Sequence, residues 1–291
     1  MKYDNGSAFR RALEDRLRSM SIQTGMPLTR LRKMVAFDRY LARLLKYQPG
    51  CWILKGGLAL QLRLGAEART TKDIDLLLLD VQQNILISLR SAGALDLKDW
   101  FSFEVSNPEN DTDEVGGKRY AVRAILDTRG FEAFHIDIGV ADALTEPPDQ
   151  LVTPELLIFA EIQPTIVPCY PIAQQIAEKL HAYTRLHASG ESSRVKDFVD
   201  MLLMASLAEI HADRLYKAIE TTFRQRGTHP LSTPLPEPPV IWVTSYKKIS
   251  TELGIGFPSL DEAFIALQKF LNPILSEVPV TCWDSIQWHW D

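Results

Sequence analysis

Two aspartates at the start of a short apolar run have the clearest chemical potential in this chain. Asp73 and Asp75 lie two residues apart and are followed by the leucines at 76–79, a pattern that predicts a strand over residues 73–79. Because side chains at positions i and i+2 of a strand point to the same face, the two carboxylates would converge. Converging like charges are costly unless cations neutralise them, and Mg²⁺ binds both carboxylates and triphosphates. A metal site is one interpretation, and a solvent-exposed pair is the other.

A pair of glycines upstream of these aspartates favours the metal site. Gly56 and Gly57 follow the apolar run 52–54, and fifteen residues separate Gly57 from Asp73. Glycine lets backbone N–H groups approach a phosphate closely, and Lys55 adds a positive charge beside the turn. Glycines followed by carboxylates therefore predict a site that binds a triphosphate together with metal ions.

A third carboxylate is available further along the chain. Residues 118–127 and 131–140 are predicted to form two strands joined by a hairpin turn at 127–130. Ile136 and Ile138 would then face the core, whereas His135 and Asp137 would lie on the opposite face. Asp137 either completes a three-carboxylate site or is a solvent-facing aspartate. His135 is better suited to a structural or supporting role than to binding Mg²⁺, which prefers oxygen ligands.

Charged residues also gather on two predicted helices in the C-terminal half. Apolar residues recur at three- and four-residue steps over 171–187 and again over 193–208. The charged positions outside these apolar stripes are Glu178, Lys179, Arg185, Arg194, Lys196, Asp197 and Asp200. Taken alone, they describe an ordinary charged helix pair.

The two groups of residues together resemble a known family. Leu-Lys-Gly-Gly-x-Ala-Leu at 54–60 and Arg-x-Thr-x-Asp-Ile-Asp-Leu at 69–76 resemble the bacterial AbiEii/AbiGii abortive-infection toxin family, within the nucleotidyltransferase (DNA polymerase β-type) superfamily. Glu-Lys-Leu-x-Ala at 178–182 and Arg-x-Lys-Asp-x-x-Asp at 194–200 match further family motifs. Val199 departs from the tyrosine that relatives often have there. The resemblance is strong over 51–79 and moderate over 171–204.

The resemblance implies an α/β (α+β) fold in two lobes. Residues 1–150 would form a nucleotidyltransferase-fold lobe with a small mixed sheet, and residues 151–291 a mainly helical lobe with a Pro-rich linker at 227–239. It also implies an Mg²⁺-dependent nucleotidyltransferase that moves NMP from NTP to an acceptor hydroxyl, the 3′ end of tRNA. The protein would act as the toxin of a type IV-like toxin–antitoxin system, with a cognate antitoxin as its partner.

The resemblance assigns roles to individual residues. Asp73 and Asp75 would hold two Mg²⁺ ions, and Asp137 would help to bind one of them. Lys179 would reach the triphosphate, where charge builds on the leaving pyrophosphate, and Asp200 would orient Lys179 or Arg194. The implied nucleotide-binding residues are Lys55, Gly56, Gly57, Arg69, Thr71 and Arg194.

Composition places the chain among soluble globular proteins. Its 291 residues are 46% hydrophobic and 24% charged, and no segment approaches the ~20 apolar residues of a membrane helix. Cys51, Cys169 and Cys282 are odd in number and widely spaced, which predicts reduced thiols in the cytoplasm. No Cys/His cluster in the sequence has the spacing of a zinc site.

The net charge of −5 is unfavourable for a nucleic-acid partner, but it is unevenly distributed. Residues 1–46 carry eleven Lys/Arg and four Asp/Glu, a local charge of +7, which leaves −12 for the remainder. This segment is either a basic surface that contacts RNA phosphates or a pair of solvated helices with one buried face.

The remaining pattern predicts the other elements of both lobes. Helices are expected at 8–21, 28–47, 57–63, 81–91, 153–162, 211–226 and 261–271; strands at 51–54 and 101–106; and a polar loop at 107–117. Trp283, Trp288 and Trp290 in the tail are expected to dock onto the body of the protein. Two other functions remain compatible with the sequence: a small-molecule, antibiotic-type nucleotidyltransferase, and a non-catalytic nucleotide-binding interaction module.

Overall fold

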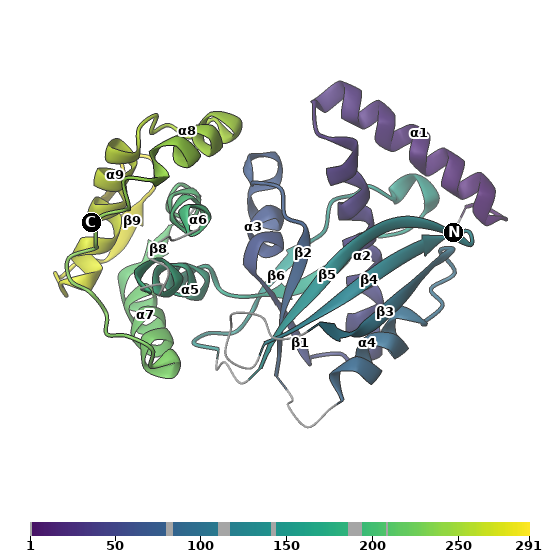
Figure 1. Ribbon diagram of the computed structural model, residues 1–291, viewed down its shortest axis with the longest axis horizontal. Helices are drawn as coiled ribbons and strands as arrows, with labels where there is room; N and C mark the ends of the chain where they lie inside the picture. The colour runs from purple at the N-terminus through teal and green to yellow at the C-terminus, as the bar shows by residue number, and fades with distance from the viewer. Residues whose placement is uncertain (1, 80–83, 110–116, 141–143, 186–193, 208) are drawn as a thin grey trace. The chain divides into compact units, whose positions relative to one another are not determined.

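A computed structural model describes residues 2–79, 84–109, 117–140, 144–185, 194–207 and 209–291 (Figure 1). The chain divides into two compact units: Met1–Ala143 with Pro148–Cys169, and Leu144–Pro147 with Tyr170–Asp291. The first unit extends past residue 150, because residues 149–152 and 166–169 form strands that join its sheet. The start of the expected helix 81–91 and most of the polar loop 107–117 lie outside the described residues.

Within the described residues, the first unit is built on a seven-stranded mixed sheet in the order β3-β4-β5-β2-β1-β7-β6 (Figure 1). The strands are β1 (Trp52–Lys55), β2 (Asp73–Leu78), β3 (Phe101–Glu109), β4 (Lys118–Leu126), β5 (Arg129–Val140), β6 (Asp149–Val152) and β7 (Ile166–Cys169). Strand β2 pairs antiparallel with β1 and parallel with β5. The strand carrying the two aspartates is therefore central.

Alternation over residues 73–76 of β2 and 134–138 of β5 gives this part of the sheet one apolar and one polar face. Ile74 lies beside Ile136 and Leu76 beside Ile138, and all four side chains are buried. The residues between them point to the opposite face, as the period of two requires. The predicted orientation of Ile136 and Ile138 toward the core is confirmed.

Four helices of the first unit match the predicted helices at 8–21, 28–47, 57–63 and 81–91. They are α1 (Gly6–Thr24), α2 (Leu28–Tyr47), α3 (Gly56–Leu64) and α4 (Ile85–Gly93). Asn5 caps α1 by accepting a hydrogen bond from the Ala8 N–H. Helix α2 packs on the apolar face of the sheet, where Tyr40 makes edge-to-face contacts with Phe103 and Phe134.

The helix predicted at 153–162 is wrong. The segment holds a short 3₁₀ helix, Ile158–Ala160, between β6 and β7. These strands pair antiparallel, with Val152 opposite Ile166, and the Thr153 N–H continues the pairing by donating to the Thr165 carbonyl. Strand pairing thus overrides the local helical pattern.

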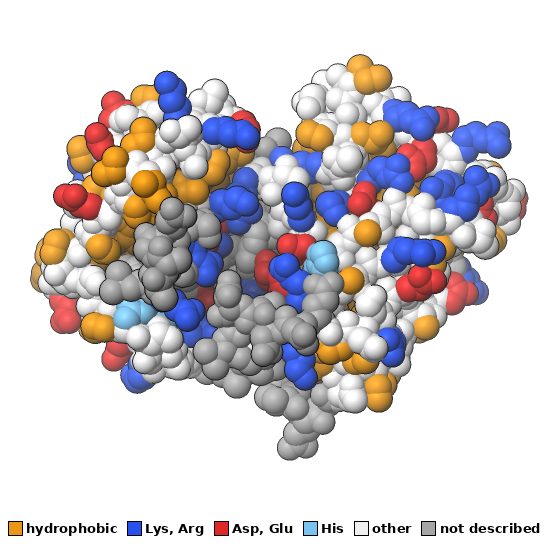
Figure 2. Space-filling view, in the orientation of Figure 1, with side chains coloured by type: hydrophobic (Ala, Val, Ile, Leu, Met, Phe, Trp, Pro, Cys, Tyr) orange, Lys and Arg blue, Asp and Glu red, His pale blue; other side chains and the backbone are white. Residues whose placement is uncertain are grey.

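Many basic side chains of residues 1–46 are used inside the first unit. Arg39 and Arg43 are buried and form ion pairs with Asp99, and Lys33 pairs with Glu132. The exposed basic residues of the segment are Lys2, Arg11, Arg16, Arg18 and Lys46, and Figure 2 shows basic side chains over α1. Much of the +7 charge therefore balances acids of the same unit, which weakens the interpretation of the whole segment as an RNA-binding surface.

The second unit is mainly helical, as predicted. Its elements are α5 (Ile172–Thr184), α6 (Val195–Ala205), α7 (Ala212–Arg226), α8 (Trp242–Leu253), α9 (Leu260–Leu275), β8 (Ile210–His211), β9 (Cys282–Asp284) and β10 (His289–Trp290). Among the described residues, no helix is long and apolar enough to cross a lipid bilayer.

The proline-rich segment 227–239 and the tryptophan-rich tail are both packed within this unit. Tyr183 donates to the Pro236 carbonyl, and the Leu235 N–H donates to Asn272 Oδ1, so the segment is anchored along its length rather than a free linker. Trp283 is buried, and its indole N–H donates to the Ala205 carbonyl. Docking of the C-terminal tryptophans onto the body is confirmed.

Candidate active site

The parallel pairing of β2 with β5 brings the predicted carboxylates onto one face of the sheet. Asp73 lies beside His135, and Asp75 lies beside Asp137, in direct register. All four side chains are partly exposed, and Figure 2 shows acidic, basic and histidine side chains together over these strands. The His135 Nδ1 atom lies 3.3 Å from Asp73 Oδ1, which is consistent with a supporting role for this histidine.

An arginine from the next strand lies among these carboxylates. Arg119 of β4 is the register partner of Asp137 and donates to both its oxygens, from Nε at 2.7 Å and from Nη2 at 2.6 Å. Its Nη2 atom is also 3.6 Å from Asp73 Oδ2. The hydrogen bond that Arg119 donates to Asp137 and the charges of Asp137, Asp73 and Asp75 raise the pKa of Arg119 further above its usual value. The acidic face thus already holds one permanent cation.

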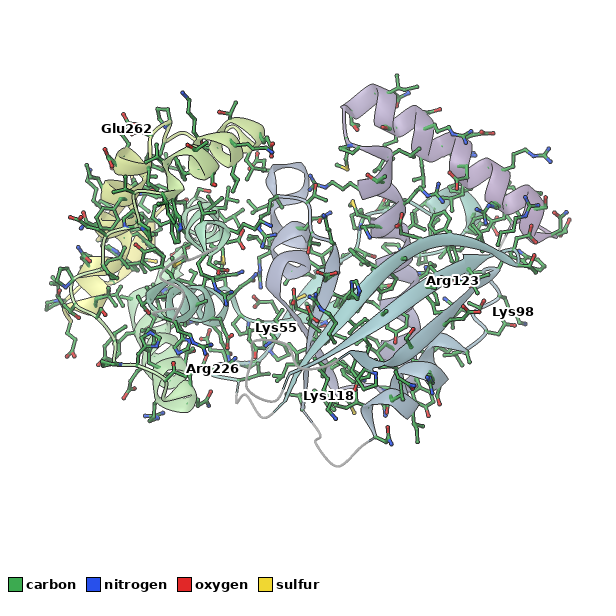
Figure 3. The ribbon with its side chains drawn as sticks, viewed as in Figure 1. Lys55, Lys98, Lys118, Arg123, Arg226 and Glu262 are labelled. Atoms are coloured by element: carbon green, nitrogen blue, oxygen red, sulfur yellow. The ribbon has the colours of Figure 1, made fainter. Side chains whose placement is uncertain are left out.

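Sequence reasoning missed Arg119, although a signal was present. Strand β4 alternates between buried and more exposed positions, so Arg119 and Arg123 share a face (Arg123 is labelled in Figure 3). Counting in steps of two along both predicted strands of the hairpin would have placed Arg119 on the same side as Asp137.

The glycine turn packs directly against Asp75. Gly56 begins α3 with φ +67°, a backbone conformation that favours glycine. A Cβ atom built there would lie 2.0 Å from Asp75 Oδ2. Lys55, at the end of β1 (Figure 3), is buried and pairs in register with Asp75. The helix N-terminus, which suits anionic groups, is therefore adjacent to the acidic face.

The second glycine brings two more predicted residues to the same place. A Cβ atom built at Gly57 would lie 2.9 Å from Thr71 Oγ1 and 3.5 Å from Arg69 Nη2. Thr71 is buried and its hydroxyl donates to the Asp73 carbonyl at 3.3 Å. Lys55, Gly56, Gly57, Arg69 and Thr71 thus surround the start of α3 next to Asp75.

We expect Gly56→Ala to reduce nucleotide transfer by about 100-fold, because misplacing a reacting group by about 1 Å can have that effect. The added methyl group would both strain the backbone at φ +67° and push the Asp75 carboxylate aside. Gly130→Ala is the matched control, since a Cβ atom there meets nothing within 4 Å. Transfer assays should show near-normal rates for the control; equal rates in both variants would contradict the proposed role of the turn.

The predicted residues of the second unit form a separate charged cluster. Lys179 Nζ donates to Asp197 Oδ1 at 2.7 Å and lies 3.0 Å from Asp200 Oδ2. The Asp200 side chain is fully buried, and Arg194 Nη1 lies 3.5 Å from Asp197 Oδ2. The sequence predicts that Asp200 orients Lys179 or Arg194. In the structure, Asp200 contacts Lys179. Arg194 pairs with Asp197, and Lys196 is exposed.

Glu178, the neighbour of Lys179 in the motif, has a structural partner. Both its oxygens accept hydrogen bonds from Arg226 Nη2 at 3.1 Å, which joins α5 to the C-terminal end of α7 (Arg226 is labelled in Figure 3). Sequence reasoning did not identify Arg226, because it lies 48 residues away along the chain.

Comparison with known proteins identifies the family. Residues 39–270 match the family model described as nucleotidyl transferase AbiEii toxin, type IV TA system. The chain therefore belongs to the AbiEii family of nucleotidyltransferase toxins, and the resemblance found in the sequence is confirmed. Membership defines the protein as a nucleotidyltransferase with an NTP substrate, and as the toxin of a type IV toxin–antitoxin system with an antitoxin partner.

A solved structure shows the same fold. MenT4, a nucleotidyltransferase toxin from Mycobacterium tuberculosis H37Rv, aligns with a TM-score of 0.55 at 18% identity, covering 91% of this chain and 98% of that chain. JHP933 from Helicobacter pylori aligns with a TM-score of 0.41 at 18% identity, covering 84% and 94%. No curated protein matches the chain.

Proposed function

We propose that this toxin transfers NMP from an NTP to the 3′ end of tRNA in an Mg²⁺-dependent reaction. The observation that supports the chemistry best is the β2–β5 register, which sets Asp73, Asp75 and Asp137 on one face. Gly56 at the start of α3 packs against one of these carboxylates, that of Asp75. An acidic face beside a helix N-terminus can accommodate both cations and phosphate.

The residues present fit divalent metal ions. Asp73 and Asp75 offer oxygen ligands. Arg119 already pairs with Asp137 and lies close to Asp73, which indicates that positive charge is stable beside these carboxylates. Asp137 would become a ligand once Arg119 releases it. When bound, Mg²⁺ lowers the pKa of the attacking hydroxyl and neutralises the triphosphate.

The chain's own residues would hold the nucleotide. The N–H groups at Gly56 and Gly57, the Thr71 hydroxyl, and the charges of Lys55 and Arg69 would contact the phosphates. Lys179 and Arg194 would supply charge for the leaving pyrophosphate, with Lys179 oriented by Asp200. In the transfer, the acceptor oxygen bonds to the α-phosphorus and the bond from that phosphorus to the β-phosphate oxygen breaks.

The tRNA acceptor is tested by incubating the protein with α-labelled NTPs, Mg²⁺ and total tRNA. We expect labelled tRNA, and we expect no label on tRNA whose terminal cis-diol has been destroyed by periodate. Label that persists after periodate treatment would contradict the 3′ end as the acceptor. Absence of label on any tRNA, together with label on an aminoglycoside, would replace the proposal with a small-molecule nucleotidyltransferase.

Arg119→Gln provides a test of the metal site that does not depend on activity. Without the guanidinium, the carboxylates of Asp73, Asp75 and Asp137 repel one another. We therefore expect a lower melting temperature without metal, a larger rise when Mg²⁺ is added, and about tenfold tighter Mg²⁺ binding, equivalent to about 1.4 kcal/mol.

Arg123→Gln is the control for this experiment. It removes the same charge from the same face of β4, but Arg123 is exposed and pairs with Glu104 instead. Mg²⁺ should affect this variant as it affects the unmodified protein. Arg119→Gln with an unchanged response to Mg²⁺ would mean that Arg119 and Mg²⁺ do not share ligands.

A further inference from the structure

Three potential metal ligands meet on the outer face of the small sheet in the second unit. Glu209 immediately precedes β8, His211 ends β8, and Cys282 begins β9. Glu209 and His211 are two residues apart, so they share a face, and His211 is paired in register with Cys282. Ile210, which lies between Glu209 and His211, pairs in register with Trp283, which follows Cys282.

The inner face of this pairing fixes the backbone under the three ligands. Ile210 and Trp283 are 2% and 1% exposed, and the Trp283 ring packs against Phe270 with centroids 4.9 Å apart. The Asp291 N–H also donates to the Cys282 carbonyl at 3.0 Å. The positions of the three ligands therefore follow from a buried anchor rather than from flexible side chains alone.

The distances from the Cys282 sulfur to the other two ligand atoms are close to those of a tetrahedral metal site. Cys282 Sγ lies 3.2 Å from Glu209 Oε1 and 3.7 Å from His211 Nδ1, and all three ligand atoms lie within 4.8 Å of one another. Zinc bonds of about 2.0–2.3 Å at tetrahedral angles require ligand separations of about 3.4–3.6 Å. The two Cys282 distances lie within a few tenths of an ångström of this range.

We propose that Glu209, His211 and Cys282 bind a Zn²⁺-type transition-metal ion. Thiolate and imidazole ligands select borderline-soft ions over Mg²⁺, so this site is chemically distinct from the acidic face of the first unit. Glu209 and His211 are exposed, which gives the ion access from solvent. The fourth coordination position is open to water.

Binding would fasten β9 to the start of α7. His211 and Cys282 are 71 residues apart in sequence. Only folding brings them together, so the ion would bind the folded state and not the unfolded chain. Metal binding should thus stabilise the second unit. Without metal, burial and the hydrogen bond to Glu209 raise the pKa of the Cys282 thiol; an ion would displace this proton.

The probe is Co²⁺, added to the chelator-treated protein in excess Mg²⁺, which is included to compete for the carboxylates of the first unit. One equivalent should produce the sulfur-to-cobalt charge-transfer absorption of a thiolate ligand, and one equivalent of Zn²⁺ should remove it. Zn²⁺ should also raise the melting temperature of the unmodified protein.

Two variants assign the site. Cys282→Ser should abolish the charge-transfer band. His211→Gln should weaken Co²⁺ binding by more than about 100-fold, which exceeds the loss expected for a residue that only hydrogen-bonds to a metal ligand. Cys51→Ser, which changes a thiol of the first unit, should leave both effects unchanged. A protein without the band, or a band and a Zn²⁺-induced melting shift retained in Cys282→Ser, would overturn the proposal.

Discussion

Asp73→Asn is expected to reduce nucleotide transfer by about 1,000-fold or more and to abolish growth inhibition. The substitution removes a charge from the proposed metal site, and loss of about 4 kcal/mol of transition-state stabilisation corresponds to three orders of magnitude in rate. The Asp73 side chain is 30% exposed and contributes little to the core, so the variant should remain folded. Transfer of labelled NMP and growth after induction measure the two effects.

A carboxylate elsewhere on the same sheet provides the matched control. Glu104→Gln makes the same change of charge on β3, where the side chain is 62% exposed and pairs with Arg123. This variant should keep both transfer and toxicity. Toxicity that survives Asp73→Asn in a folded protein would contradict the metal-dependent chemistry.

Lys179→Met is expected to reduce both transfer and stability. The substitution removes the ammonium group that contacts Asp197 and the fully buried Asp200. Removing one partner of a buried ion pair costs about 3–5 kcal/mol, because the other charge remains in a poorly solvated place. Thermal or urea unfolding should therefore show a clear destabilisation, in addition to a loss of activity comparable with that of Asp73→Asn.

The double variant Lys179→Met with Asp200→Asn separates the two roles. Neutralising Asp200 removes the uncompensated buried charge while keeping a side chain of the same shape, so much of the stability should return. Transfer should stay low, because the cation proposed for the pyrophosphate is still missing. Lys196→Met, an exposed lysine on the same helix pair, is the control; recovery of transfer in the double variant would make Lys179 purely structural.

The acidic face was predictable because the segments that carry its aspartates alternate with a period of two. The alternation of Asp73, Ile74 and Asp75 and of Ile136, Asp137 and Ile138 fixes which side chains share a face before any pairing is known. In the structure, the isoleucines of the two strands pair with each other and are buried, as this alternation predicts. The helices α1, α2, α5 and α7 were likewise predictable from their apolar stripes.

Features that depend on pairing between distant segments were not predictable. The strands β6 and β7 are four residues each and become strands through their pairing with each other and with β1. Helix α8 was not predicted. It lies directly after the prolines, and its side chains at Val243 and Lys247 face solvent.

The charged clusters show the same limit. Arg119 reaches Asp137 across a hairpin, Arg43 reaches Asp99 across 56 residues, and Cys282 reaches His211 across 71. No local spacing links Arg43 to Asp99 or Cys282 to His211, whereas the period of two does place Arg119 on the same face as Asp137. The charge of residues 1–46 was misleading for this reason, since the acids that balance it lie elsewhere in the sequence.

The most direct measurement is a crystal structure of the protein with Mn²⁺ and a non-hydrolysable NTP analogue. Anomalous scattering locates Mn²⁺ independently of the model of the protein. The account predicts manganese at Asp73 and Asp75, Arg119 withdrawn from Asp137, and the triphosphate on the backbone of Gly56 and Gly57. A nucleotide bound elsewhere, with no manganese at these carboxylates, would contradict it.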